Sequence, residues 1–202
     1  MVAKVAADVR VNEIFISYSR KDKEFVQFLD GSLRNLGHDP WVDWEDIQPT
    51  EDWWAAIQSG IEKANNFIFV ISPDSIASKV CRQEIEHAVL HNKRLVPIVR
   101  REGFEMQDVH PALATHNWLF IRETDNFEQF LQILVKALET DLVYLNEHTR
   151  LQTRAIEWDK KEQNESSLLR GTDLDAAEQW LTHASGKTPQ PTELHGKYIN
   201  AS

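Results

Sequence analysis

Two histidines of this 202-residue chain stand four positions apart, a spacing that can hold a metal ion. His87 and His91 fall on one face of a predicted helix, as Zn²⁺ ligands often do. No third ligand stands beside them in the sequence, so a solvated helix face is the preferred interpretation. Cys81 is the only cysteine, which excludes an internal disulfide and a cluster of thiolate ligands. We therefore expect no metal site.

A serine and an arginine follow the first apolar run, at a position that suits phosphate binding. Ser19 and Arg20 come directly after Glu13–Ser17, where a predicted helix begins. The free N–H groups of a helix N-terminus bind phosphate, and a guanidinium adds charge there. For Arg20 the alternative is a surface ion pair with a nearby acid. For Ser19, capping of the helix is the preferred role.

Five short apolar runs are the predicted strands that would position these residues. They are Glu13–Ser17, Asp39–Asp43, Phe67–Ser72, Arg94–Val99 and Trp118–Ile121. Phe67–Ser72 is apolar almost throughout, as expected of a strand covered on both faces. Pro40 indicates that the second strand lies at a sheet edge, because proline donates no hydrogen bond.

Amphipathic segments separate the runs and predict helices. They cover Ser19–Leu36, a segment opened by Thr50, Glu51 and Asp52, a segment from Pro73 to about Asn92, and one from a capping box at Asp125 and Glu128 to about Tyr144. Residues expected to face the core are Phe25, Phe28, Leu29, Leu33 and Leu36 in the first helix, and Trp54, Ile57 and Ile61 in the second.

This alternation predicts an α/β fold, a flavodoxin-like doubly wound five-stranded parallel sheet with helices on both faces. Ligands of such folds bind beyond the carboxyl ends of the strands, where the strand order reverses. The corresponding segments here are Ser17–Arg20, Asp43–Asp46 and Ser72–Ser75.

The pattern changes after about residue 146, where no further strand is predicted. Two amphipathic segments, His148–Leu169 and one around Leu174–Leu181, predict a C-terminal helical extension, with Leu151, Ala155 and Trp158 on one stripe. We divide the chain into a domain over 1–145 and an extension over 146–202. The extension is expected to lead to a further module, a fused or partner sensor.

Composition limits the classes of partner. The net charge of −10 disfavours nucleic acid, because an acidic surface repels phosphate backbones. No apolar run approaches the roughly 18 residues that span a bilayer, and the N-terminus has no apolar stretch typical of a signal peptide. These features, with the single cysteine, predict a cytoplasmic protein without a membrane segment.

Three blocks in register resemble the Toll/interleukin-1 receptor (TIR) domain family. They are IFISYSRKD (Ile14–Asp22), WVDWEDIQPTEDWW (Trp41–Trp54) and FVISPDSIASKVCRQEIEHA (Phe69–Ala88). The resemblance covers roughly residues 12–145 and favours the bacterial-type, NAD-cleaving branch. In enzymatic relatives one helix glutamate serves in cleavage of NAD, and the matching residue here is Glu84. NAD is then a substrate, and no cofactor is implied.

One carboxylate is chemically sufficient for this reaction. Nicotinamide leaves the ribose as a neutral molecule, so no general acid is required, unlike in ordinary glycosidases. A carboxylate beside the ribose can stabilise the oxocarbenium-like transition state. By the same resemblance, water as the acceptor gives ADP-ribose and internal attack gives a cyclic isomer.

The resemblance also implies a set of substrate-binding residues around Glu84. These are Ser19, Arg20, Asp43, Trp44, Thr50 and Cys81. Asp43–Asp52 matches the family loop that closes over the ligand and mediates self-association, and the Trp44 indole could stack on a ring of NAD. The chain departs from the family at Thr50, where glycine is usual, and at Val80, where tryptophan is frequent.

Three functions remain open at this level. The first is an NAD glycohydrolase or cyclase in defence or cell-death signalling, activated by self-association through TIR–TIR contacts. The second is a non-enzymatic interaction module that uses the same surfaces. The third, a phosphorylatable receiver domain, is disfavoured because Ser17–Ser19 and Ser72 occupy the places where receivers carry acids.

Overall fold

A computed structural model describes residues 13–44 and 51–202 of the chain. The sheet contains β1 (Glu13–Ser17), β2 (Asp39–Trp41), β3 (Asn66–Ile71), β4 (Arg94–Val99) and β5 (Leu119–Phe120). All neighbouring strands are parallel, in the order β2-β1-β3-β4-β5. The order reverses between β1 and β3, and β2 with Pro40 lies at the edge. Both the doubly wound fold and the edge position of the second strand are therefore confirmed.

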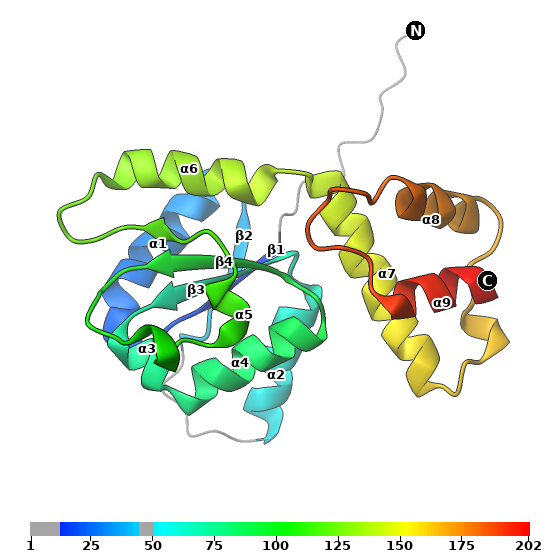
Figure 1. Ribbon diagram of the computed structural model, residues 1–202, viewed down its shortest axis with the longest axis horizontal. Coiled ribbons are helices and arrows are strands. Elements are labelled where there is room, and N and C mark those ends of the chain that lie inside the picture. The colour runs from blue at the N-terminus through cyan, green and yellow to red at the C-terminus, as the bar shows by residue number, and fades with distance from the viewer. Residues whose placement is uncertain (1–12, 45–50) are drawn as a thin grey trace, which may run out of the picture.

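Helices cover both faces of the sheet (Figure 1). On one face lie α1 (Lys23–Asn35) and α6 (Phe127–Glu139), and on the other lie α2 (Glu51–Lys63), α3 (Pro73–Ala77), α4 (Lys79–Leu90) and α5 (Pro111–Ala114). Side chains alternate along β1 accordingly: Ile14 and Ile16 belong to the core under α1 and α6, whereas Phe15 belongs to the core under α2 and α4.

Gly60 allows α2 to approach the sheet closely. A Cβ atom at this position would lie 3.0 Å from the Trp41 ring and 3.3 Å from the Phe15 ring. These two rings stack with centroids 4.9 Å apart, so the missing side chain creates the room that they fill. The face of α2 that bears Ile57 and Ile61 is thereby held on the sheet, as predicted.

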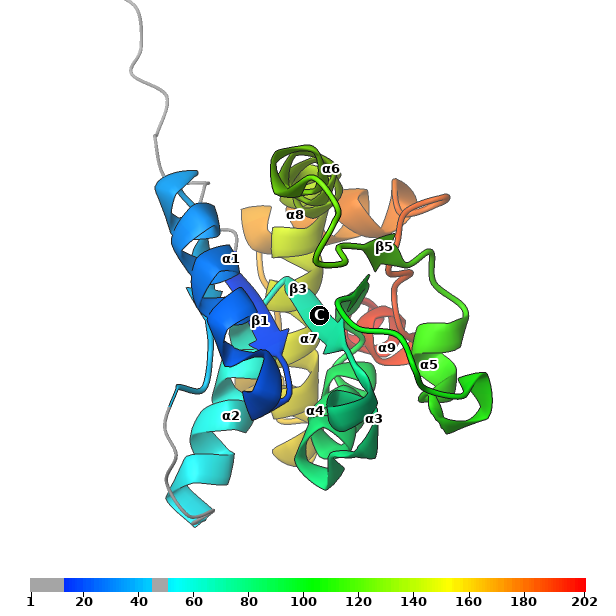
Figure 2. The ribbon, with the colours of Figure 1, turned by 90° about the vertical axis from the view of Figure 1, so that its left-hand side faces the viewer.

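The C-terminal part forms its own small helical layer, seen beside the sheet domain in Figure 1 and behind it in Figure 2. It contains α7 (Leu142–Lys160), the short 3₁₀ turn η3 (Glu165–Ser167), α8 (Thr172–Thr182) and α9 (Glu193–Ala201). Two further 3₁₀ turns, η1 (Arg20–Asp22) and η2 (Met106–Asp108), belong to the sheet domain. Leu151, Ala155 and Trp158 of α7 are buried in this second core, as predicted. Because α7 begins at Leu142, the predicted boundary at 145 falls inside its first turn, and the division itself stays a prediction.

The extension is docked on the sheet domain by polar contacts. The Asn65 amide donates to Oδ1 of Asn146 (2.5 Å), the Asn92 amide donates to the Gln190 carbonyl (2.8 Å), and the Arg94 guanidinium donates to the Thr188 carbonyl (3.2 Å). Within the described residues, no helix combines the length and apolar character needed to cross a bilayer.

Several predicted helix boundaries and faces were wrong. The helix from Pro73 is interrupted at Ser78, whose extended backbone (ψ 122°) ends α3 and begins α4. The helix cap near residue 125 is Asn126, because Asp125 instead accepts from the backbone N–H of Arg122. Phe28 and Leu36 are 59% and 53% exposed, since Val26 takes the inward position on α1.

Three further predictions also required correction. The second strand ends at Trp41 instead of Asp43. The helix predicted to reach Tyr144 divides at Asp141, which is left-handed (φ 57°). His87 and His91 do not form a solvated face: their side chains are only 10% and 7% exposed, because α2 lies against them. Thr50, expected to open α2, lies outside the described residues.

Candidate active site

A pocket of about 380 Å³ opens beyond the carboxyl end of β1, at the point where the strand order reverses. The residues that line it are Ile16, Tyr18, Ser19, Arg20, Lys21, Asp43, Trp53, Ser78, Val80, Cys81 and Glu84. Its volume lies in the range of small-molecule sites. The fold therefore brings together five predicted site residues that are spread over 66 positions of sequence, Ser19 to Glu84.

Glu84 is the buried acid of this pocket. Glu84 lies in the second turn of α4 and is only 5% exposed. The Ser17 hydroxyl, at the end of β1, donates to Oε2 of Glu84 at 2.5 Å. Ser78 begins α4 by accepting from the backbone N–H of Cys81 (3.3 Å), which fixes the helix start two turns before this carboxyl. The end of β1 and the cap of α4 together place the Glu84 carboxyl group in the pocket.

Burial changes the ionisation of this acid. The pKa of Glu84 is raised to about 8: loss of solvation raises it most, the Ser17 hydrogen bond lowers it, the nearby Asp43 carboxylate raises it and the Arg20 charge lowers it. In the free protein at pH 7, the neutral form of Glu84 therefore predominates. A cationic ligand in the pocket would favour the ionised form.

Arg20 and Asp43 form an ion pair at the mouth of the pocket. Nη2 of Arg20 lies 2.9 Å from Oδ2 of Asp43, which also accepts from the Trp53 indole N–H (3.1 Å). The Tyr18 hydroxyl donates to the Asp43 carbonyl at 3.0 Å. The sequence left a choice between a phosphate ligand and an ion-pair partner for Arg20, and the structure shows the ion pair.

Cys81 lines the pocket as a thiol. Its Sγ–H donates to the Tyr18 carbonyl (3.4 Å). Burial, followed by the neighbouring Glu84, raises the pKa of Cys81 to about 12. The thiolate form, which is the nucleophile in cysteine chemistry, is therefore negligible at neutral pH.

Of the two candidate indoles, Trp53 and not Trp44 lines the pocket. Trp44 packs against the core under α1 and α6, with its ring 6.0 Å from the Tyr18 ring. Trp53, in the first turns of α2, stands at the pocket wall. Prediction from sequence placed Trp54 in the core and gave Trp53 no role in the site. The hydrogen bond from its indole N–H to Asp43 distinguishes Trp53 from Trp44. This contact depends on the fold, so no local sequence pattern predicts it.

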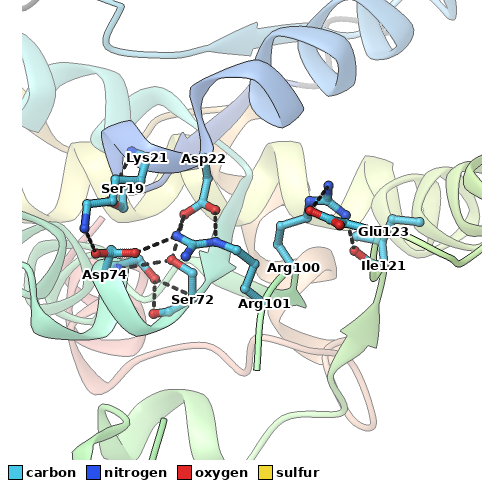
Figure 3. Close-up of polar contacts among 10 residues, drawn as sticks. Ser19, Lys21, Asp22, Ser72, Asp74, Arg100, Arg101, Ile121 and Glu123 are labelled. Carbon is cyan, nitrogen blue, oxygen red and sulfur yellow. Dashed lines mark hydrogen bonds and ion pairs between the residues drawn. The ribbon is translucent and has the colours of Figure 1, made fainter. Parts of the chain in front are cut away.

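An ion-pair network holds η1, and hence Ser19 and Arg20, at the pocket (Figure 3). The buried Asp22 carboxylate accepts from the Arg101 guanidinium (2.7 Å) and from the Ser72 hydroxyl (2.6 Å). Arg101 also pairs with Asp74 (2.7 Å), which in turn pairs with Lys21. Ser19 accepts from the Lys21 N–H at 3.4 Å, so it caps η1 as expected.

The doubly wound sheet, with a buried carboxyl at its switch point, places the chain in a class of α/β domains that bind small ligands at the carboxyl edge. Comparison with known families defines it further. The family model described as "TIR domain" matches residues 14–135, more than half of the chain. The chain therefore belongs to the TIR domain family.

A solved structure supports this fold. The TIR domain of the Toll-related receptor TRR-2 from Hydra magnipapillata is 22% identical, with a TM-score of 0.53, over 63% of this chain and 98% of that one. A metazoan TIR-STING receptor from C. gigas is 23% identical (TM-score 0.49; 68% and 43% covered), and the CMP N-glycosidase BcmB of Clostridium botulinum is 18% identical (0.42; 60% and 97%). The comparison with curated proteins gave no match.

Proposed function

We propose that this chain cleaves the bond between nicotinamide and ribose in NAD, with Glu84 as the catalytic residue. The observation that carries the proposal is the Glu84 carboxyl, buried in a pocket at the switch point of a TIR domain and held there by Ser17. A buried acid of this kind suits a reaction that develops positive charge on the ribose and needs no acid for the leaving group.

The raised pKa of Glu84 fits this reaction. NAD carries a cationic pyridinium, so its entry favours the ionised carboxylate. The electron pair of the C1′–N bond leaves with neutral nicotinamide, and the carboxylate stabilises the ribosyl cation. Water then adds to C1′ and passes its proton to Glu84, whose pKa makes it a competent base. Attack from within the molecule instead of by water would give a cyclic isomer.

The other pocket residues have distinct roles in this proposal. Arg20 exchanges its Asp43 partner for a phosphate of the dinucleotide, as a guanidinium can. The Trp53 ring offers a stacking surface where the family tryptophan is replaced by Val80. Ser19, Tyr18 and the Cys81 thiol shape the wall.

We also propose that the activity is cytoplasmic, serves defence or cell-death signalling of the bacterial type, and increases when domains self-associate. A sensor module joined to or recruited by the extension would then control the local concentration of the domains. Under this proposal, the rate of nicotinamide release per molecule rises with protein concentration. A rate per molecule that is constant over a hundredfold range would contradict activation by assembly.

A non-enzymatic interaction module is the second candidate, favoured by one observation. Phe28 of α1 and Ile133 of α6 are exposed, and the Phe28 ring contacts Phe127 at 4.4 Å between centroids. Apolar side chains exposed on neighbouring helices can form a protein interface. An NAD-independent scaffold would use this surface and would tolerate substitution of Glu84.

The decisive experiment incubates concentrated protein with NAD and separates the products by chromatography. Wild-type protein should release nicotinamide, and Glu84→Gln should abolish release while circular dichroism remains unchanged. Glu86→Gln is the matched control, because Glu86 is exposed on the same helix and pairs only loosely with Arg82 (3.5 Å). Folded wild-type protein that leaves NAD intact at every concentration would overturn the proposal and leave the scaffold.

A further inference from the structure

Two histidines and a glutamate converge between α2 and α4, away from the pocket that holds Glu84. His87 and His91 occupy successive turns of α4, with ring centroids 4.4 Å apart. Oε1 of Glu62, in the last turn of α2, lies 3.1 Å from Nε2 of His87 and 3.4 Å from Nε2 of His91. One ligand atom from each of the three residues falls within 4.8 Å of the others.

We propose that Glu62, His87 and His91 form a binding site for a transition-metal ion, with Zn²⁺ as the preferred ion, that links α2 to α4. This site is independent of the reaction proposed above. It supplies three protein ligands and leaves the remaining coordination position to water.

The distances match such a site. Zn²⁺ binds imidazole nitrogen and carboxylate oxygen at about 2.0–2.2 Å in a tetrahedral arrangement, which puts neighbouring ligand atoms about 3.3 Å apart. The two separations from Glu62, 3.1 and 3.4 Å, bracket this value. Small side-chain movements therefore suffice to accommodate the ion.

The protonation of the rings also suits a metal. Both rings are largely buried, and desolvation lowers the pKa of His87 and lowers that of His91 to about 4. Both imidazoles are therefore neutral at pH 7 and have a lone pair to offer. Two imidazoles and one carboxylate favour zinc and its first-row neighbours over Mg²⁺ and Ca²⁺, which prefer oxygen ligands.

Two lysines face the cluster and oppose a cation. The Lys93 ammonium donates to the backbone carbonyl of Glu62 (2.6 Å), and both Lys93 and Lys160 lower the pKa of the two histidines through their charge. Their repulsion and the three-ligand set predict weaker binding than in a closed four-ligand structural site. The competing arrangement is metal-free, with the His87 ring hydrogen-bonded to Oε1 of Glu62 and Nε2 of His91 3.4 Å from the same oxygen.

A metal at this position would act on the candidate pocket through two helices. His87 lies one turn after Glu84 on α4, and Glu62 lies on the same helix as Trp53. Occupancy would fix α2 and α4 relative to one another, and both helices contribute wall residues to the pocket. The immediate consequence is stabilisation of the fold, because the ion binds a site that exists only in the folded chain.

The test uses the full chain, treated with a chelator and then titrated with ZnCl₂ by calorimetry and thermal denaturation. We expect one zinc per chain and a higher Tm. Co²⁺ titration should give the visible absorption of a four-coordinate site. His91→Asn and Glu62→Gln should each weaken zinc binding at least tenfold. If His91→Asn does not fold, Glu62→Gln alone tests the site, because Glu62 is half-buried and glutamine keeps the shape of its side chain. His183→Asn, at an exposed histidine of α8, should bind as wild type.

Two results would overturn the inference. One is zinc binding that is absent or does not saturate in wild-type protein. The other is binding of unchanged affinity in both Glu62→Gln and His91→Asn, which would place the ion elsewhere in the chain.

Discussion

At the scale of single residues, the main feature of the candidate site is a carboxyl group that the proposed reaction needs in its ionised form, although it is buried where ionisation is costly. The pKa of Glu84, about 8 in the folded chain, lies above the ordinary value of 4.5. Between these two values the unfolded chain has released the proton that the folded chain retains. The free energy of unfolding therefore falls as pH rises from 4.5 to 8, by about 1.4 kcal/mol per pH unit from this residue.

Glu84→Gln should remove this pH dependence, because glutamine keeps the shape of the side chain and does not ionise. Relative to wild type, the variant should gain about 2–3 kcal/mol of stability between pH 6 and pH 8. Urea denaturation at the two pH values measures the difference. If the free energy of unfolding changed equally in the two proteins between pH 6 and pH 8, the pKa of Glu84 would not be raised by the fold.

The two tryptophans near the pocket should differ in their effect on NAD cleavage. Trp53→Phe should lower kcat/KM about tenfold, because it removes part of the stacking surface and the N–H that binds Asp43. Trp44→Phe should stay within about twofold of wild type, since the Trp44 ring packs in the core. Nicotinamide release at low NAD concentration measures both, and an equal loss in the two variants would contradict the assigned roles.

Prediction from sequence reached Glu84, Arg20, Ser19, Asp43 and Cys81, which the fold brings to one pocket. It missed Ser17, the hydrogen-bond donor to Glu84. Ser17 belongs to an apolar strand, and its partner lies 67 positions away, so no local pattern marks the pair. Trp53 was missed for a related reason, because adjacent tryptophans at helical spacing do not show which one faces a cavity.

At the scale of elements, the position of Glu84 depends on where α4 begins. Ser78 interrupts what the sequence predicts as one helix, and its side chain caps the second part. After Pro73 at its first position, the segment contains neither glycine nor proline, so the usual signals of a break at Ser78 are missing. A serine hydroxyl that competes for backbone N–H groups is a weaker signal, which is read reliably only once the fold is known.

Ser78→Ala should reduce the free energy of unfolding by about 1 kcal/mol, the usual cost of losing such a cap. Ser78→Asp should restore most of that stability, because aspartate accepts the same N–H and suits the positive end of the helix. Thermal denaturation of the three proteins measures the effect. Equal stability of Ser78→Ala and wild type would mean that the cap does not hold α4.

Across the whole molecule, the alternation of strands and helices predicted the sheet domain well, whereas the packing of the extension could not be predicted from the sequence. α9 was not expected, since Gly196 is a poor helix former and the N-terminal capping box uses His195 in place of a glutamate or glutamine. The docking contacts of Asn65, Asn92 and Arg94 join residues more than eighty positions apart, which local patterns do not reveal.

Acid should destabilise the extension first. The backbone N–H of Thr192 donates to Nδ1 of His195, so this nitrogen must carry no proton and the ring must be neutral. Burial lowers the pKa of His148 to about 3 and that of His195 to about 4, below the ordinary 6.5. The unfolded chain therefore takes up protons first as pH falls through 6.5. At pH 5 each residue should have cost about 2 kcal/mol of stability.

Trp180 reports this change directly, because its ring contacts both His148 and His195. Its fluorescence should shift toward that of an exposed indole between pH 6.5 and 4.5, ahead of the loss of circular dichroism from the sheet domain. Trp180→Phe identifies the part of the signal that comes from this residue. An unchanged Trp180 signal down to pH 4 would contradict the assigned role of the two histidines.

The pH dependence of nicotinamide release from NAD tests the central claim most directly, which is that one buried carboxylate carries the reaction. For wild-type protein, kcat/KM should rise about tenfold per pH unit toward pH 8 and then level, because it reports ionisation in the free enzyme. Glu86→Gln should follow the same curve, and Glu84→Gln should stay at background throughout. Release by Glu84→Gln at the wild-type rate, or none by folded wild-type protein at any pH, would contradict it.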